Sequence, residues 1–247
     1  MSDPTSDPGH ELDLPPIPPA EREAAQAVRR LGMALLGRTV RPEMASRVAA
    51  QVAALAAEVE AASPERTKVD AFLGYTGVAR ARHFLTTGHW PAPSADYGEI
   101  RFDAMSYIGG PVHPFSAGAR YYRDGDEAVA RVTVDMGFEG PPGRVHGGTI
   151  ASIFDEVMGT VFRIRALPSA FTGSLNVRFE APAPLDVELE FRARLVNVEG
   201  RKHFVEAEAT GPDGRFASAT AVFIQMAGDH MAATYGRLLE GEGHPPA

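Results

Sequence analysis

Alternation of apolar and polar residues dominates the second half of the chain. In the stretch EAVARVTVD, every second residue from Ala128 to Val134 is apolar, and this period of two is typical of a half-buried β-strand. Later stretches repeat the alternation and are separated by turn signals such as EGRK and GPDG. The predicted strands span residues 127–135, 171–181, 187–198, 203–210 and 216–226, with a further strand from about Ala119 before the turn in YYRDGDE.

One long helix interrupts this series of strands. Between Gly147 and about Arg163, apolar residues recur at helical spacing and form one face. That face consists of Ile150, Ile153, Phe154, Val157, Met158, Val161 and Phe162. The order β-β-α-β-β-β-β provides no second helix for βαβ crossovers, so we predict an α+β fold with a mostly antiparallel sheet of about six strands around this helix. The other face of the sheet then needs a cover, either from a partner subunit or from the N-terminal segment.

The N-terminal half follows a different pattern. Residues 1–20 contain six prolines and few apolar residues, which favours a disordered tail. Two alanine-rich helices are expected next, one from Glu21 to Gly37 and one from Pro42 to Ser63, as an extension that covers a sheet or makes an oligomer contact. Residues 64–116 are predicted to be irregular, with a segment lying over the domain as a lid. We therefore divide the chain into a tail (1–20), an extension (21–117), a sheet domain (118–226) and a C-terminal tail (227–247).

Composition narrows the functional classes. The chain has 247 residues, a net charge of −8 and no cysteine, which excludes disulfides, cysteine nucleophiles and thiolate metal sites. The eight histidines show no paired spacing on a helix, so no metal and no cofactor are expected. The sequence has no dense basic patch, which argues against a nucleic-acid-binding protein. It also has no apolar run long enough to span a membrane. With no secretory signal visible, a cytoplasmic location is expected.

Candidate chemistry concentrates in GRVHGGTIASIFDE, residues 143–156. Gly147 and Gly148 stand at the predicted helix start, where up to four backbone N–H groups lack internal partners and the helix dipole favours negative charge. Such donors suit a carbonyl oxygen that gains charge in a transition state. A solvated glycine-rich turn is the alternative. His146, directly before the helix, either orients this turn or contacts substrate as a general base.

Further along the helix, Asp155 lies on a face of small residues, so that another surface can approach it closely. Glu156 points to the opposite flank, and a solvated acid is the alternative interpretation for both. The next strand carries Thr172, Ser174 and Asn176 on one side, where a hydroxyl could hold a water molecule beside Asp155.

These residues resemble the hotdog-fold acyl-CoA thioesterases, in the group that includes phenylacetyl-CoA thioesterases and mammalian thioesterase-superfamily members. The shared motif is His146-Gly147-Gly148 with a helical acid nine positions after the histidine, here Asp155. The strand FTGSLNVRFEAPAPL, the loop GPPGR and the segment FDAMSYIGGPVHP also look like members of this group. Some members have an asparagine six positions before the histidine, where this chain has Gly140.

The resemblance implies a mechanism and a partner. The Gly147 N–H would polarise the thioester carbonyl, and Asp155 from the other subunit of a dimer would activate water or attack the carbonyl. Thr172 would hold the water. The resemblance implies an acyl-CoA substrate and a role in lipid metabolism. It also implies that the protein assembles as a homodimer or a dimer of dimers. Substrate-binding candidates, including cations for the CoA phosphates, are Gly148, Arg144, Ser174, Arg178, Arg201 and Lys202.

Two other functions remain open from the sequence. A non-catalytic module that binds acyl-CoA or fatty acid would keep the fold without hydrolysis, although such a module has no need for Asp155. An acyl-CoA hydratase is a weaker hypothesis, because no separate Asp and His stand at the spacing of a hydratase.

Overall fold

The structure is a computed structural model that describes residues 16–226 except 66–67, 77, 91–97 and 102. The predicted C-terminal tail lies outside the described residues, and so does most of the predicted N-terminal tail. The predicted division into domains stays a prediction; helix α1 begins at Pro19, and Ile17 packs against a small buried cluster. Proline suits the first turn of a helix, where its missing N–H is not needed.

Seven antiparallel strands form one sheet with the order β1-β2-β3-β5-β6-β7-β4. Their bounds are β1 Glu99–Ile100, β2 Arg120–Asp124, β3 Glu127–Thr133, β4 Ala170–Phe179, β5 Glu188–Glu199, β6 Lys202–Gly211 and β7 Gly214–Gln225. The prediction of an antiparallel sheet is confirmed. The short strand β1 raises the number above the predicted six, and it lies in a segment predicted to be irregular.

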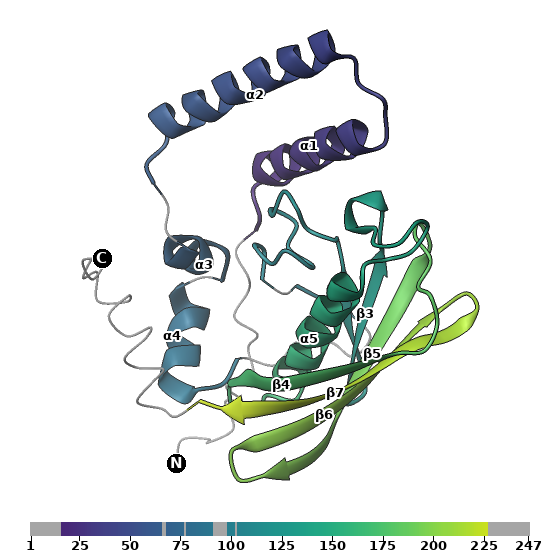
Figure 1. The fold of residues 1–247 in the computed structure, drawn as a ribbon. Coiled ribbons are helices and arrows are strands. Elements are labelled where there is room, and N and C mark those ends of the chain that lie inside the picture. The colour runs from purple at the N-terminus through teal and green to yellow at the C-terminus, as the bar shows by residue number, and fades with distance from the viewer. Residues whose placement is uncertain (1–15, 66–67, 77, 91–97, 102, 227–247) are drawn as a thin grey trace.

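The sheet curves around the long helix α5 (Gly147–Ile164), as Figure 1 shows. The predicted apolar face of this helix is buried, and Ile153, Phe154 and Val157 have no exposed surface. Phe154 meets Phe191 of β5 edge to face, with ring centroids 5.0 Å apart. The helix thus has the central place that its period-3.6 pattern predicts, with its apolar face against the sheet and its polar residues Ser152 and Asp155 along a cavity.

Within the described part of the chain, four helices precede the sheet: α1 (Pro19–Leu36), α2 (Pro42–Ala62), α3 (Lys68–Thr76) and α4 (Val78–Thr87). The first two confirm the predicted helices. The prediction of an irregular segment over residues 64–116 is wrong for α3 and α4, which are short and carry no long apolar stripe. They are held by tertiary contacts, since Ala71, Ala81 and Phe84 are buried.

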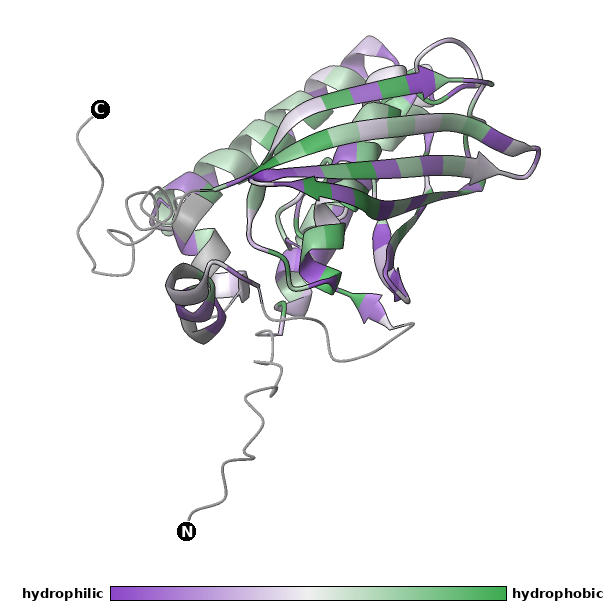
Figure 2. Cartoon of the chain, turned by 90° about the horizontal axis from the view of Figure 1, so that it is seen from below, coloured by the Kyte–Doolittle hydropathy of each residue, from purple (hydrophilic) through white to green (hydrophobic). Residues whose placement is uncertain are grey.

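The N-terminal helices do not cover the outer face of the sheet. Figure 1 shows them on the side where α5 lies, and α1 packs against the 3-10 turn η1 (Met136–Phe138). The expectation that the N-terminal segment covers the second face is therefore wrong for the described residues. Figure 2 shows polar and apolar residues alternating along the strands, as expected for a sheet with one buried face. Polar residues such as Glu206 and Glu208 lie on the outer face, together with some apolar residues such as Phe171, which is 57% exposed. Helix α2 buries none of its residues, so its predicted oligomer contact stays a prediction.

No helix among the described residues is both long and apolar enough to cross a membrane.

Candidate active site

The loop before α5 is held in place by backbone hydrogen bonds. Gly143 has a φ of 75°, which glycine adopts without strain, and the turn closes when Arg144 N–H donates to the Pro141 carbonyl at 3.0 Å. Val145 N–H donates to the Ala183 carbonyl, at 3.0 Å. His146 N–H then donates to Phe138, at 2.8 Å. The start of the helix is therefore preorganised before any substrate binds.

His146 is the N-cap of α5. Its Nδ1 atom accepts a hydrogen bond from Gly148 N–H at 2.9 Å, which places the ring proton of the neutral imidazole on Nε2. A histidine in this role orients the turn, which is one of the two functions expected from the sequence. The bond also occupies the Gly148 N–H, so this glycine is not a free donor for substrate.

Gly147 differs from Gly148 in this respect. Among the residues that the structure describes, no acceptor is found for its backbone N–H, which stands at the first position of the helix. A Cβ at this position would lie 3.3 Å from Cζ of Phe179, so the helix start packs closely against the end of β4. This leaves one N–H at the positive end of the helix dipole for an external acceptor.

Gly140 explains the departure from the asparagine found in some similar proteins. A Cβ at residue 140 would lie 2.9 Å from the backbone Cα of His146, a distance that side chains do not tolerate. Gly140 N–H also donates to the Arg144 carbonyl at 2.9 Å. Close packing against the backbone of His146 therefore leaves no room for a side chain at residue 140.

Asp155 and Thr172 meet inside a cavity along α5. Thr172 Oγ1 donates a hydrogen bond to Asp155 Oδ1 at 2.7 Å. Both residues line a cavity of about 400 Å³, together with Ser152 on the preceding turn of the helix. The carboxylate is partly buried, accepts from a hydroxyl and adjoins open space, an arrangement that can orient and deprotonate a water molecule.

A β-bulge separates Thr172 from the other polar residues of β4. The register against β7 shifts between Thr172, which pairs with Phe223, and Ser174, which pairs with Val222. The extra residue, Gly173, has no room for a side chain, because a Cβ there would lie 2.9 Å from Cγ1 of a neighbouring isoleucine. Thr172 therefore faces α5, whereas Ser174 and Asn176 face the opposite side of the sheet. The prediction that Thr172, Ser174 and Asn176 share one side of the strand is wrong for this reason.

Glu156 is not a solvated acid. It accepts hydrogen bonds from Ser106 Oγ at 2.5 Å and from Tyr121 Oη at 2.6 Å. Burial raises the pKa of Glu156 above its usual range, although these two hydrogen bonds act in the opposite direction. The carboxyl group ties residues of the extension and of β2 to α5, directly beside Asp155. Sequence patterns did not indicate this cluster, because its members are far apart along the chain.

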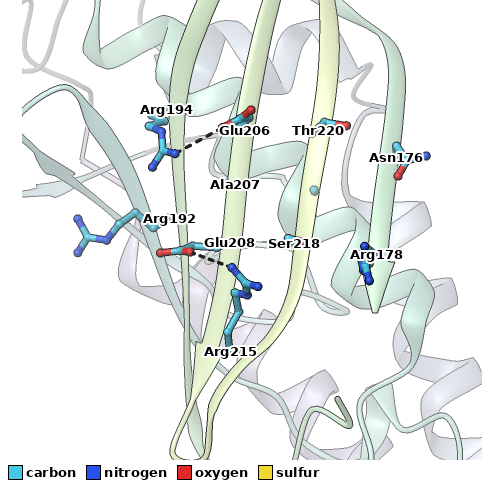
Figure 3. A pocket seen from close by; sticks show the side chains of 11 residues that line it. Asn176, Arg178, Arg192, Arg194, Glu206, Ala207, Glu208, Arg215, Ser218 and Thr220 are labelled. Carbon is cyan, nitrogen blue, oxygen red and sulfur yellow. Dashed lines mark hydrogen bonds and ion pairs between the residues drawn. The ribbon is translucent and has the colours of Figure 1, made fainter. Parts of the chain in front are cut away.

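The predicted CoA-binding cations do not converge on one point. Arg144 is exposed in the loop before α5. Arg201 donates hydrogen bonds from Nε and Nη2 to the Gln225 carbonyl, at 3.1 and 2.7 Å. Lys202, which is exposed, is the next residue in the β5–β6 hairpin. This hairpin lies at the same end of the sheet as Thr172. Arg178 is on the outer face near the opposite end of β4, where Figure 3 shows it among polar side chains.

That outer face carries a network of ion pairs. Arg192 contacts Asp124 at 2.6 Å and Glu127 at 3.0 Å, while Arg194 contacts Glu206 at 3.4 Å. Figure 3 shows such pairs across neighbouring strands around a shallow hollow. Since Arg192, Arg194 and Arg215 each have an acidic partner, most of the positive charge on this face is balanced within the sheet.

Comparisons with known proteins agree with this geometry. Residues 142–218 match the sequence profile of the Thioesterase superfamily. Acyl-coenzyme A thioesterase THEM4 of Mus musculus is 37% identical over 90 residues, which cover 36% of this chain and 38% of the mouse protein. Acyl-coenzyme A thioesterase THEM5 of Homo sapiens is 33% identical over 90 residues, covering 36% of each chain. The chain thus matches little more than a third of the length of these relatives.

A solved structure extends the likeness in fold. The crystal structure of a thioesterase superfamily protein superposes with a TM-score of 0.67 and 23% sequence identity, covering 85% of this chain and 93% of the other. That coverage exceeds the sheet domain, so the shared fold includes part of the N-terminal extension. Residues 142–218 thus match the thioesterase-superfamily profile, and this stretch contains His146, Gly147, Gly148 and Asp155, the residues that carry the resemblance.

Proposed function

We propose that this protein is an acyl-CoA thioesterase, which hydrolyses the thioester of an acyl-CoA to a free acid and CoA. The observation that carries the proposal is the Asp155–Thr172 pair in a cavity beside the central helix of a thioesterase-superfamily domain. The names of the similar mouse and human proteins support the same activity.

In this mechanism, Asp155 either removes a proton from water that attacks the carbonyl carbon or attacks that carbon itself. The carbonyl oxygen gains negative charge and accepts a hydrogen bond from Gly147 N–H. The carbon–sulfur bond then breaks and CoA leaves as a thiolate, which takes up the proton held by Asp155 or, in the second route, the proton released when water hydrolyses the anhydride. In the second route water hydrolyses the acyl-enzyme anhydride and restores Asp155. Thr172 orients the carboxylate through its hydroxyl group.

The proposed site needs two protomers. Gly147 and Asp155 lie on the same helix, eight residues apart, which corresponds to about 12 Å along its axis. One thioester carbonyl cannot contact both groups of a single chain over that distance. The N–H and the carboxylate that act together must therefore come from different copies of α5.

Strand β4 offers the surface for this assembly. It is an edge strand in the described sheet, paired with β7. Thr172, beside Asp155, lies near one end of β4, and Phe179, beside Gly147, lies at the other. Antiparallel pairing of β4 with the β4 of a second copy brings the Thr172 end of each protomer next to the Phe179 end of the other. We propose this homodimer, with two shared sites.

Thiol release from a panel of acyl-CoAs tests the activity, with calorimetric binding as the second measurement. Release of CoA from at least one substrate is the expected result. Binding without any hydrolysis would instead favour the alternative of a non-catalytic acyl-CoA-binding module.

Mixed dimers test the shared site. Asp155→Asn and Gly147→Pro each inactivate both sites of their own homodimer in this account. After mixing and exchange of subunits, half of the dimers are mixed and hold one intact site, so activity should recover to about one quarter of the wild-type value. Activity that does not recover in mixtures that light scattering shows to have exchanged would contradict the shared site.

A further inference from the structure

The cavity beside Asp155 runs along one face of α5 towards the C-terminal end of the helix. Its floor is a helical stripe made of Ser152, Asp155, Glu156, Gly159, Phe162 and Arg163. Asp155 and Arg163 are eight residues apart, about 12 Å along the axis. A substituent that begins at a carbonyl group beside Asp155 can therefore extend by roughly this length before it reaches the last turn of the helix.

Trp90 of the N-terminal extension lies at the far end of the cavity, beside Arg163. Trp90 lines the cavity and stacks on Phe84 of α4, with ring centroids 4.0 Å apart and planes inclined by 16°. The Arg163 guanidinium carbon lies 4.8 Å from the centroid of the Trp90 ring. The indole is thus held between a buried aromatic ring and the end of α5, and it forms a firm wall rather than a free side chain.

The walls between these two ends combine aromatic side chains with the polar residues Asp103 and Ser169, and they leave open space. Phe162 and Phe223 pack together with centroids 5.0 Å apart, and both line the cavity. Midway along the floor, a Cβ at Gly159 would meet no atom within 4 Å. The cavity volume of about 400 Å³ lies near the lower end of the range of roughly 300–1,000 Å³ found for small-molecule sites.

We propose that Trp90 sets the upper limit on the length of the acyl group, so that the preferred substrates carry short to medium-length apolar acyl groups. This inference rests on the proposed thioesterase function and adds the role of the N-terminal extension in selecting the substrate. The acyl chain lies along α5 with its carbonyl at Asp155 and its end against the indole ring. Longer chains are rejected because the stacked Trp90 cannot move aside without losing its contacts with Phe84 and Arg163.

Trp90 is the one tryptophan of the sequence, so its fluorescence reports on the far end of the cavity directly. The Asp155→Asn variant is titrated with CoA alone and with acyl-CoAs of increasing length, in the absence of turnover. We expect no change in emission with CoA or acetyl-CoA, and a shift to shorter wavelength once the chain is long enough to reach the indole. An emission that responds equally to CoA alone and to all chain lengths, or to none of the acyl-CoAs that calorimetry shows to bind, would overturn the proposal.

Two substitutions test the limit on chain length by thiol release. Trp90→Ala opens the end wall, so kcat/KM for the first chain length that the wild type rejects should rise about tenfold or more relative to its best substrate. Gly159→Leu fills the middle of the floor without altering Trp90, and its preference should move to shorter chains. Phe115→Ala, at a side chain that is 69% exposed, is the control with an unchanged profile.

The outcomes separate the two proposals. If the wild type hydrolyses acyl-CoAs while folded Trp90→Ala or Gly159→Leu keeps the wild-type profile, the role of Trp90 is wrong and the thioesterase function stands. If Trp90→Ala does not fold, Gly159→Leu and the fluorescence titration still decide. If the wild type binds acyl-CoAs with the expected fluorescence response and hydrolyses none, the thioesterase function is wrong and the position of the acyl group stands.

Discussion

Replacing Gly147 with proline removes one N–H group from the start of α5 and disturbs little else. Proline is favoured at the first helical position, and the preceding His146 has φ −61° and ψ 134°, values that suit a residue before proline. The helix loses no internal hydrogen bond, because an N–H at this position has no intrahelical acceptor. The substitution therefore tests the proposed donor to the thioester oxygen with a small structural cost.

The size of the effect follows from the role of that donor. Removing one hydrogen-bond donor from an oxyanion site typically lowers kcat by about 10²–10³, or about 2.7–4 kcal/mol of transition-state stabilisation. The matched control is Gly147→Ala, which adds the same Cβ near Phe179, at 3.3 Å from its Cζ atom, but keeps the N–H. We expect kcat of Gly147→Pro to be lower than that of Gly147→Ala by this factor in a thiol-release assay, with similar melting temperatures. Equal kcat values for the two variants would refute the assignment of the Gly147 N–H.

Three further predictions concern neighbouring groups. Thr172→Val removes the hydroxyl that donates to Asp155, and kcat should fall about tenfold to hundredfold, since a hydrogen bond to a charged group contributes about 1.5–3 kcal/mol. Thr220→Val on β7 is the control. An unchanged kcat in Thr172→Val would count against a catalytic role for the Asp155–Thr172 pair. His146→Ala removes the N-cap and should lower the free energy of unfolding by about 0.5–2 kcal/mol, whereas His146→Asn should largely retain it; denaturant titration checks this, and an equal loss in both variants would argue against capping. Burial raises the pKa of Glu156, so the folded protein binds a proton at this carboxyl group more tightly than the unfolded chain does. The contribution of Glu156 to the free energy of unfolding therefore grows as the pH falls from neutral through the raised pKa towards the pKa of about 4.3 of an unfolded glutamate. The free energy of unfolding of the wild type should therefore rise relative to that of Glu156→Gln between about pH 7 and pH 5, and a difference independent of pH would contradict it.

The elements with a strong local pattern could be predicted from the sequence. Helix α5 and strands β3, β5, β6 and β7 each carry a clear period, because one face is buried in a single core. The short helices α3 and α4 could not be predicted, since neither carries a long apolar stripe; α3 instead packs against distant residues such as Ala104.

Within the candidate site, the motif of His146, Gly147 and Asp155 was visible because its members are close together on one helix and its cap. The bulge at Gly173 could not be predicted, because a single glycine in a strand does not show whether the register of the neighbouring residues shifts there. The prediction of one polar side for β4 failed at that residue. The Glu156 cluster and the contact between Trp90 and Arg163 join residues that only the fold brings together.

Asp155 is the group on which the proposed hydrolysis depends, and Asp155→Asn tests it most directly. Asparagine has nearly the same shape and can still accept the Thr172 hydrogen bond through its oxygen, but it can neither take a proton from water nor attack a carbonyl. With folding verified by circular dichroism and with Asp126→Asn as a control at an exposed acid, thiol release from the best acyl-CoA should fall by about 10²–10⁴. A folded Asp155→Asn variant that releases CoA at the wild-type rate would contradict the account.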